Sequence, residues 1–400
     1  MIKNVFFYCP SKKIGGEQQL YIRCAKYLVT HTDAKVFYVD YTDGYAQEVL
    51  SEKVIRIDKS HLSTYKFEED TLFIIALSYI DKYFELFNVN DLPQGFRFLF
   101  WSLQPYNLTG KILIRNKYNL LLPWQKKQFR DILYPLCNSG IIRIMDYNNY
   151  YTLHQVFGLN LNEIDYLPVP IDDDYIRNAE SFSFSRTCTD KMSFLWLSRI
   201  DHDKKHTLMT VVNELNIVNR SHPCRLYIVG DGNALEEIGR YASDKEVEII
   251  FVGRCFGGNL NSLIDTKVDV GVGMGTSGLE IAKRGKPVIM KKVMKKTCEA
   301  GVVNDYIFLH QEYGYSLGSP DFYVEGQSYF ASKVEELLSD YSTCAKKDYE
   351  YTKKCHSIET TGQLLKRVME KPPMIEDEYK QINELATLIN KYRRITFRKA

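Results

Sequence analysis

Residues 271–290, GVGMGTSGLEIAKRGKPVIM, contain a Gly-x-Gly-x-x-Gly motif at 273–278, the spacing that suits a dinucleotide pyrophosphate. In a dinucleotide site the motif follows the first strand of its domain, and an acidic residue about 20 positions later binds the ribose. Here the motif comes late in its domain, the helix from Ser277 is short, and the next strand ends in Lys291 and Lys292. The sequence therefore argues against a nicotinamide or flavin cofactor, and we expect no cofactor.

The same segment still suits an anion. Glycines let the backbone approach a ligand closely, and free amides at the start of a helix attract negative charge. Gly275, Thr276 and Ser277 are therefore candidates for phosphate binding. Glu280 has two interpretations, because Ser277-x-x-Glu280 also matches a capping box in which the glutamate only caps its own helix.

A second candidate anion site lies in LSRIDHDKKHTLM, residues 197–209, which follows a predicted strand. Arg199 and either Lys204 or Lys205 fall in the loop between that strand and a helix, at the carboxyl edge where open α/β sheets bind ligands. Two cations there suit a pyrophosphate, since arginine binds it bidentately and lysine as a point charge. Exposed loop lysines are common, however, so surface decoration is the alternative interpretation.

The candidate residues lie in a chain whose short apolar runs alternate with longer helical patterns. This alternation predicts parallel βαβ units, which would position the candidate residues. One series fills the first part of the chain, and a second begins at MSFLWLSRI, residues 192–200. We expect an α/β protein with two doubly wound, Rossmann-like domains, at 1–170 and 192–349. Residues 171–191 form the predicted linker, and helices at about 350–400 are expected to pack back on the first domain.

Composition narrows the class of protein. The 400 residues are 45% hydrophobic and 26% charged, and 52 Lys and Arg against 50 Asp and Glu leave a net charge of +2. No global field attracts nucleic acid, so we expect no nucleic-acid partner. Nine scattered cysteines without a C-x-x-C pair argue against a zinc ribbon or a disulfide framework, and we expect no metal.

The ends of the chain bear on its location. The first residues show no signal peptide, and no run approaches the roughly 18 apolar residues that span a bilayer. We therefore expect a cytoplasmic protein. The last ten residues hold five basic and no acidic side chains, so the tail is either an amphipathic helix on anionic lipid at the inner face of the cytoplasmic membrane or a solvated final helix.

Taken in order, these motifs resemble the GT-B nucleotide-sugar glycosyltransferases, especially the family-4-like enzymes that build bacterial surface polysaccharides. The resemblance covers most of residues 1–370. The motifs that carry it are IGGEQQLYIRCAKYL, LPVPID, SRIDHDKKH, YIVGDG, IFVG and GLEIAKRGKPVI. It implies two Rossmann-like domains that face each other across a cleft, with the first binding the acceptor and the second a nucleoside-diphosphate sugar of the UDP or GDP type.

The resemblance also assigns roles to residues. Arg199 and Lys204 would bind the donor diphosphate, with Lys204 preferred over Lys205 because its spacing from the arginine is commoner in the family. Glu280 would bind the ribose. The other implied donor-site residues are Gly15, Gly16, Gly230, Gly253 and Arg254, of which Arg254 is equally compatible with simple surface exposure.

Two departures from the family pattern concern the reaction. Retaining members usually carry Glu-x7-Glu, and the first position here is Val272, which puts the stereochemical outcome and the donor sugar in question. The family often has a histidine after the strand in FLFWSLQPYNLTG, residues 98–110, where this chain has Gln104. Gln104 cannot act as a base, although it could hydrogen-bond an acceptor hydroxyl. Trp101, Tyr106 and Asn107 could form an acceptor wall, with a core position as the alternative for Trp101.

An inverting transfer would need a base, for which Glu17 and Asp146 are the candidates. Glu17 has an alternative interpretation as a solvated carboxylate at a helix start. We expect a hexosyltransferase that stabilises its leaving group without a metal and acts on a glycan or lipid-linked acceptor, with retention favoured. The alternatives are a nucleotide-sugar epimerase of the same fold and a non-catalytic nucleotide-binding subunit.

Overall fold

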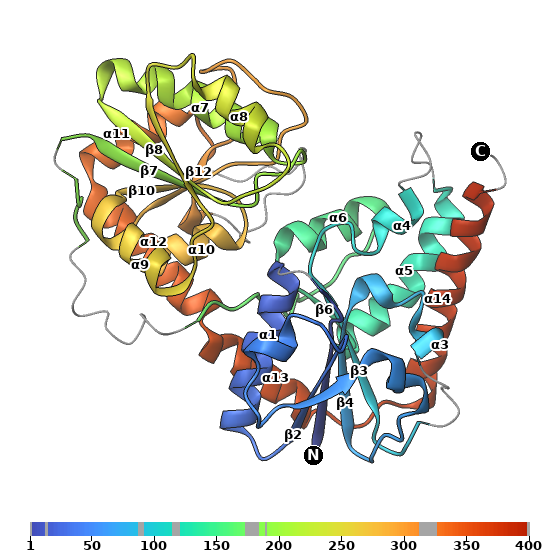
Figure 1. Ribbon diagram of the computed structural model, residues 1–400. Helices are drawn as coiled ribbons and strands as arrows, with labels where there is room; N and C mark the ends of the chain where they lie inside the picture. Colours follow the sequence, from blue (N-terminus) through green and yellow to red (C-terminus); the bar gives the residue numbers. More distant parts are fainter. Residues whose placement is uncertain are drawn as a thin grey trace. The chain divides into compact units, whose positions relative to one another are not determined.

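A computed structural model describes residues 2–12, 15–86, 92–113, 121–172, 184–188, 190–311 and 326–397 (Figure 1). The chain forms two compact units. Unit 1 comprises Met1–Pro170 and Ile358–Ala400, and unit 2 comprises Ile171–Ser357. Unit 2 thus runs to Ser357, whereas the sequence predicted its end at 349, because helix α12 (Tyr341–His356) continues past that point.

Unit 1 is built on a six-stranded sheet in the order β3-β2-β1-β4-β5-β6, in which every neighbouring pair is parallel. Its strands are almost continuously apolar, as expected for a parallel sheet covered on both faces. The order reverses between β1 and β4, whose residues Asn4 and Thr71 are paired. The strands are β1 (Asn4–Tyr8), β2 (Lys35–Asp40), β3 (Ile55–Asp58), β4 (Thr71–Ala76), β5 (Arg97–Ser102) and β6 (Ile142–Ile144).

The helices of unit 1 come from both ends of the chain. Figure 1 shows α13 beside α1 and α14 beside α5. A Cβ on Gly362 would lie 2.1 Å from the ring of Tyr27, so α13 approaches α1 closely at this glycine. The helices are α1 (Gly16–His31), α2 (Ala46–Val49), α3 (Tyr83–Leu86), α4 (Thr109–Leu113), α5 (Pro123–Ser139), α6 (Tyr147–Phe157), α13 (Ile358–Glu370) and α14 (Glu376–Phe397), with 3-10 turns η1 (Lys59–Thr64) and η2 (Leu77–Tyr79).

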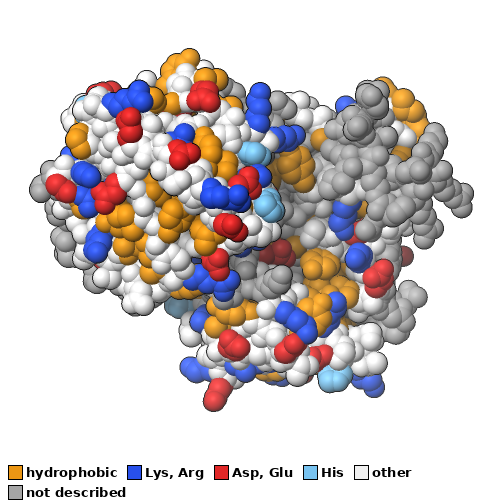
Figure 2. All heavy atoms as spheres, turned by 45° about the horizontal axis from the view of Figure 1, so that its top comes forward, with side chains coloured by type: hydrophobic (Ala, Val, Ile, Leu, Met, Phe, Trp, Pro, Cys, Tyr) orange, Lys and Arg blue, Asp and Glu red, His pale blue; other side chains and the backbone are white. Residues whose placement is uncertain are grey.

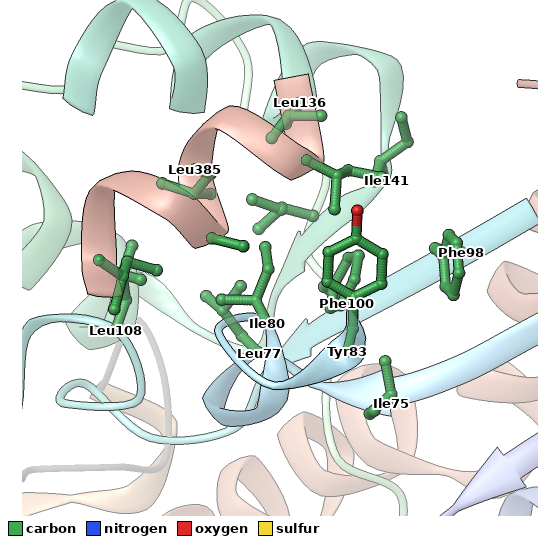
Figure 3. Close-up of a cluster of buried hydrophobic side chains, with 14 of the residues drawn as sticks. Ile75, Leu77, Ile80, Tyr83, Phe98, Phe100, Leu108, Leu136, Ile141 and Leu385 are labelled. Atoms are coloured by element: carbon green, nitrogen blue, oxygen red, sulfur yellow. The ribbon is translucent and has the colours of Figure 1, made fainter. Parts of the chain in front are cut away.

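The final helix α14 completes the core of unit 1 (Figure 3). Leu385 of α14 is fully buried in the same cluster as Leu136 of α5, Phe98 and Phe100 of β5, and Tyr83 of α3. The rings of Phe98 and Phe100 stack with centroids 5.6 Å apart, and Tyr83 meets Phe98 edge to face at 5.6 Å. Helix α14 is therefore part of the core of unit 1.

Unit 2 repeats the doubly wound pattern with the order β12-β11-β10-β7-β8-β9. Its strands are parallel except for β12, a short antiparallel edge strand that the sequence did not predict. The order reverses between β7 and β10. The strands are β7 (Met192–Leu197), β8 (Cys224–Val229), β9 (Glu248–Gly253), β10 (Val270–Gly273), β11 (Val288–Met290) and β12 (Ile307–Phe308).

Helices cover both faces of this second sheet, with α7 and α8 on one face and α9, α10 and α12 on the other (Figure 1). The long buried face of α7 packs against the sheet, whereas α12 packs mainly against α10 and η5. Helix α10 is short because Gly285 and Pro287 follow it closely. The helices are α7 (Lys205–Ser221), α8 (Leu235–Ala242), α9 (Gly257–Lys267), α10 (Thr276–Ala282), α11 (Phe330–Ser339) and α12, with the 3-10 turn η5 (Leu309–Gln311).

Part of the predicted linker 171–191 is fixed to unit 2. The fully buried carboxylate of Asp269 accepts hydrogen bonds from the amides of Thr187 at 2.6 Å, Cys188 at 3.0 Å and Ser193 at 2.9 Å. A buried carboxylate needs such donors because its charge has been removed from water. Residues 173–183, which include most of the acidic and Ser-rich linker sequence, lie outside the described residues.

In the described ranges, no helix is both long and apolar enough to cross a bilayer. The basic tail predicted to contact lipid begins at Lys391 in the last turns of α14. From residue 393 onward its side chains lie outside the described structure, so membrane contact stays a prediction.

Candidate functional site

The reversal of strand order in unit 2 brings two predicted anion-binding loops to one sheet edge. Strands β7 and β10 are parallel neighbours, with Val270 opposite Phe194 and Gly271 opposite Leu195. The loop that carries Arg199 follows β7, and the Gly275 turn follows β10, so both start at the carboxyl edge. Ligands of doubly wound sheets bind at this kind of switch point.

Lys204 is the cation best placed in the β7–α7 loop. Its Nζ donates a hydrogen bond to Oγ of Ser198 at 2.7 Å, which holds the half-buried ammonium over the end of β7. Burial lowers the pKa of Lys204, and the positive charge of Arg199 lowers it further. An anion bound between these two cations would relieve both effects, because it would neutralise a charge that is poorly solvated.

The neighbouring cations make different contacts. Lys205 begins α7 and forms a 2.9 Å ion pair with Glu237, a contact that Lys204 does not share. The preference for Lys204 as the donor-site lysine stays a prediction. Arg199 is 66% exposed along its side chain and pairs with Asp201 at 2.7 Å. An arginine held this loosely can exchange its carboxylate partner for a phosphate, because exposed ion pairs contribute little energy.

The turn between β10 and α10 exposes backbone to the same edge. Gly275 has φ 65° and ψ −150°, a conformation that only glycine adopts readily, and no atom lies within 4 Å of where its Cβ would be. Helix α10 begins at Thr276, and Ser277 Oγ donates to the carbonyl of Met274 at 2.7 Å. This turn therefore leaves open space beside the first amides of α10.

Glu280 does not cap α10, so the capping-box interpretation is wrong. The N-cap is Gly275, and Ser277 already lies within the helix. Glu280 instead pairs with Lys283 at 2.6 Å, with its side chain 19% exposed. A carboxylate oriented by a neighbouring lysine can still accept hydrogen bonds from hydroxyl groups of a ligand.

The structure gives two further arguments against a dinucleotide site. The glycine motif follows β10, which is not the first strand of its unit, and α10 has only 7 residues. Lys291 follows the strand where an NADP site could use a basic residue to bind the 2′-phosphate. Here Lys291 is fully buried and pairs with Asp305. Gly278 serves packing, because a Cβ there would lie 2.8 Å from Sδ of Met290 on β11.

Gly230 holds the β7–α7 loop in place from the neighbouring strand. It has φ 142°, and a Cβ at this position would lie 1.8 Å from the carbonyl oxygen of Ser198. Gly232, which the sequence analysis missed, makes a similar approach at 2.4 Å to the carbonyl of Ile200. The GDG pattern directly after a buried strand is the signal that could have identified Gly232 together with Gly230. They support the loop that carries the cations.

The two other predicted donor-site residues of unit 2 lie at the end of β9 and directly after it. Gly253 has φ 79° and accepts a hydrogen bond from the amide of Gly230 at 2.9 Å. Arg254 is 72% exposed along its side chain and lies 3.1 Å from the carboxylate of Asp231. Its role in binding a base stays a prediction.

In unit 1, the predicted glycines lie at the start of α1, close to the reversal between β1 and β4. Gly15 is the extended N-cap of α1, and Gly16 and Glu17 form its first turn. The side chain of Glu17 is half-buried against Cys9 at the end of β1, whose Sγ lies 3.9 Å from Glu17 Oε1. Gln18 donates to the same sulfur at 3.4 Å. Cys9 was not predicted, because a lone apolar-flanked cysteine carries no sequence signal.

Burial raises the pKa of Glu17, and the contact with Cys9 opposes this more weakly. A carboxyl whose pKa is raised in the folded state stabilises the protein fully below its unfolded pKa, about 4.3, and loses that contribution as the pH rises through the folded pKa. We therefore expect Glu17→Gln to be more stable than wild type at pH 7, with the difference gone near pH 4. Urea unfolding at the two pH values measures this.

The surface variant Glu52→Gln is the control for that comparison, since its side chain is exposed and it should change stability little at either pH. A Glu17→Gln protein that is less stable than wild type at pH 7 would contradict the assignment. It would mean that the ionised carboxylate is held by favourable contacts.

The structure corrects two of the other predicted residues. Trp101 is fully buried, packs on Tyr21 at 5.9 Å and donates from its indole nitrogen to the carbonyl of Leu167 at 2.8 Å, so it cannot form an acceptor wall. Asp146 is buried and caps α6, accepting from Asn149 at the backbone amide (2.9 Å) and Nδ2 (2.6 Å). A carboxylate used in this way serves the fold, as N-cap residues do.

The remaining acceptor-side residues lie on the loop after β5. Gln104 and Tyr106 are both exposed, Tyr106 at 48%. Asn107 shapes this loop, because its Oδ1 accepts from the amides of Leu103 at 2.7 Å and Gln104 at 2.8 Å. The two exposed side chains can therefore meet a ligand, while Asn107 fixes their backbone.

Among the side chains that the structure describes, no group of three or more His, Cys, Asp or Glu residues could hold a metal ion. All nine cysteines are free thiols. The groups that lie at the two strand reversals are thus cations and glycine turns in unit 2, and the half-buried carboxyl of Glu17 in unit 1.

No protein-family model matches this chain, and no curated protein matches it. Solved structures do. A glycosyltransferase from Rickettsia africae has a TM-score of 0.56 at 12% identity, over 92% of this chain and 98% of that one. The Escherichia coli trehalose-6-phosphate structure bound with UDP-2-fluoro glucose gives 0.54 at 9% identity, over 93% and 100%.

HepE of Anabaena, in complex with UDP and glucose, gives a TM-score of 0.50 at 14% identity, over 92% of this chain and 99% of that one. Each likeness extends across both units. The chain therefore has the GT-B fold, an α/β architecture of two Rossmann-like domains, and the fold predicted from the motif order is confirmed.

Proposed function

We propose that this protein is a metal-independent glycosyltransferase of the hexosyltransferase type. It moves a sugar from a nucleoside-diphosphate sugar to a glycan or lipid-linked acceptor in the synthesis of a cell-surface polysaccharide such as lipopolysaccharide. The observation that carries this proposal is that the loop of Lys204 and the open Gly275 turn follow neighbouring parallel strands at the strand reversal of unit 2. The UDP or glucose ligands of HepE and the E. coli protein support it.

The chemistry follows from the leaving group. Transfer releases a nucleoside diphosphate, so the enzyme must stabilise negative charge that develops on its phosphate oxygens. Arg199 and Lys204 supply fixed positive charge, and the amides that follow Gly275 supply hydrogen-bond donors. Glu280, oriented by Lys283, accepts from the ribose hydroxyls.

Retention of configuration is the favoured outcome. An inverting reaction needs a base beside the acceptor hydroxyl, and Asp146 is used as a helix cap. Glu17 remains as the candidate base, with its pKa raised by burial. The loss of all transfer in Glu17→Gln, with nucleotide binding intact, would instead favour inversion.

The first experiment is thermal unfolding with UDP, GDP, CMP and NADP in parallel. A ligand at about 100 times its dissociation constant adds roughly 2.7 kcal/mol of stability. We expect a selective shift with UDP or GDP. In Lys204→Ala the loss of a charge-assisted contact, about 1.5–3 kcal/mol, should weaken that ligand by about 10- to 100-fold.

Lys205→Ala is the matched control for Lys204→Ala, because it removes the adjacent lysine, which is paired with Glu237 instead. We expect it to keep the nucleotide shift. Stabilisation by NADP alone, or equal losses in the two variants, would refute the donor site. Product analysis then separates a transferase, which needs an acceptor, from an epimerase that interconverts free nucleotide sugars.

A further inference from the structure

A second group of cations borders the Gly275 turn from the side opposite Arg199 and Lys204. In the sheet order β11-β10-β7, the Gly275 turn follows the middle strand. The β7–α7 loop follows one neighbour, and the segment 291–301 follows the other. All three segments leave the carboxyl edge of parallel strands, so this edge places the glycine turn between two loops that carry basic residues.

The segment after β11 is fixed to the first half of α7. The amide of Met294 donates to Oγ1 of Thr207 at 2.9 Å, and Thr297 Oγ1 lies 2.9 Å from Nδ1 of His206. Further along, the amide of Cys298 donates to Oγ1 of Thr210 at 3.0 Å. These bonds follow successive positions of one helical face, so they set the whole segment against the helix that Lys204 precedes.

The fixing bonds continue to the end of the segment. Asn213 Nδ2 donates to the carbonyl of Cys298 at 2.9 Å, and the amide of Gly301 donates to both carboxylate oxygens of Glu214, at 3.1 and 3.2 Å. Glu214 is buried, so this contact lies in the interior of unit 2. A loop held at this many points presents its remaining side chains in a fixed place.

Lys295 and Lys296 are the side chains that this arrangement exposes. They lie between Met294 and Thr297, the two residues anchored to the first turn of α7, and both are exposed. Within the described part of the chain, neither lysine forms an ion pair. Figure 2 shows Lys, Arg and His side chains on one face of the molecule, with Asp and Glu side chains among them.

More cations lie here than the diphosphate of a nucleotide sugar needs. That diphosphate carries two negative charges, which Arg199 and Lys204 match once Arg199 exchanges Asp201 for phosphate. Lys295 and Lys296 add two more positive charges, with Glu299 as the acidic residue of their own segment. The turn 273–277, Gly-Met-Gly-Thr-Ser, contains no acidic side chain. Nothing in that turn would repel a second negative group on the donor.

We propose that Lys295 and Lys296 select a donor whose sugar carries a carboxylate, a nucleoside-diphosphate hexuronic acid. This inference rests on the proposed function and names the class of donor. The two ammonium groups bind the sugar carboxylate, while Arg199 and Lys204 bind the diphosphate. A neutral sugar leaves the two lysines in water and gains nothing from them, so the charge of the sugar decides affinity.

Calorimetric titration of the full-length protein tests this with matched donors. The probes are UDP, UDP-glucose and UDP-glucuronate, with GDP, GDP-mannose and GDP-mannuronate as the guanine series. We expect the acidic sugar to bind about 10-fold or more tightly than its neutral partner. The double variant Lys295→Gln/Lys296→Gln should remove that preference and change the affinity for the plain diphosphate by less than about threefold.

The control is Lys346→Gln/Lys347→Gln, two adjacent exposed lysines on α12 whose loss changes the net charge equally. It should keep the preference for the acidic sugar. Equal affinity for acidic and neutral donors would overturn the inference while leaving the glycosyltransferase proposal intact. A double variant that weakens the plain diphosphate as much as the acidic donor would also overturn it, since the lysines would then bind phosphate. Failure of every nucleotide to bind would remove the proposed function itself.

Discussion

Gly230→Ala is expected to lower the free energy of unfolding of unit 2 by about 3 kcal/mol. The new Cβ would lie 1.8 Å from the carbonyl oxygen of Ser198, a backbone atom that cannot move alone, and φ 142° is itself unfavourable for alanine. Relief requires the β7–α7 loop to shift, and with it Ser198, the partner of Lys204. The variant should therefore also lose part of the stabilisation by nucleotide. Denaturant unfolding with and without the nucleotide measures both effects.

Gly239→Ala is the control for this substitution, because it adds the same methyl group within α8, where no atom lies within 4 Å of the new Cβ. Alanine in a helix interior should leave stability unchanged or raise it by up to about 1 kcal/mol. If Gly230→Ala unfolded at the same denaturant concentration as Gly239→Ala, the close approach of the two loops would not be required by the fold.

Trp101→Ala is expected to destabilise unit 1 by about 3–5 kcal/mol, the usual cost of deleting a large buried aromatic side chain. The indole is fully buried, and its hydrogen bond to the carbonyl of Leu167 connects β5 with the last residues before unit 2 begins. Trp101→Phe keeps most of the volume but leaves that carbonyl without the indole donor, so we expect a smaller loss of about 1–3 kcal/mol. Thermal and urea unfolding give the ranking.

Tyr106→Ala separates stability from a role in acceptor binding. Tyr106 is 48% exposed on the loop after the same strand, and its removal should change stability by less than about 0.5 kcal/mol. An effect on KM for the acceptor without an effect on unfolding would place the acceptor at this loop.

A Trp101→Ala protein as stable as wild type would contradict the prediction for Trp101. It would show that the indole is not packed in the core of unit 1 in solution.

The strand pattern of the sequence predicted the central strands of both sheets, because buried parallel strands are short apolar runs separated by helices. The short edge strands β3 and β12 were not predicted. The motif order then predicted that the cations and the glycine turn belong to one donor-binding unit. What the sequence could not predict were contacts made by common residues in unremarkable surroundings. Cys9 beside Glu17, Lys283 beside Glu280 and Asn107 under its loop each depend on the fold to bring ordinary side chains together.

The two corrected residues show why the position of a residue along a strand is insufficient to predict that it binds a ligand. Trp101 and Asp146 both lie near the carboxyl edge of the first sheet, where a ligand site was expected. One side chain points into the core, and the other is used to cap the next helix. A residue at a strand-to-helix connection can cap the helix, pack in the core or contact a ligand. The sequence alone does not say which of these three roles the residue has.

The return of α13 and α14 to unit 1 has a consequence for biosynthesis. Domains generally fold during translation as soon as their chain has emerged from the ribosome. Unit 2 is continuous and can do so, but residues 1–170 must wait for α14 until all of Ile171–Ser357 has been made. Until then the apolar surface that receives Leu385 is exposed to water. Residues 1–170 of the nascent chain therefore offer a binding site to a chaperone until α14 has been synthesised.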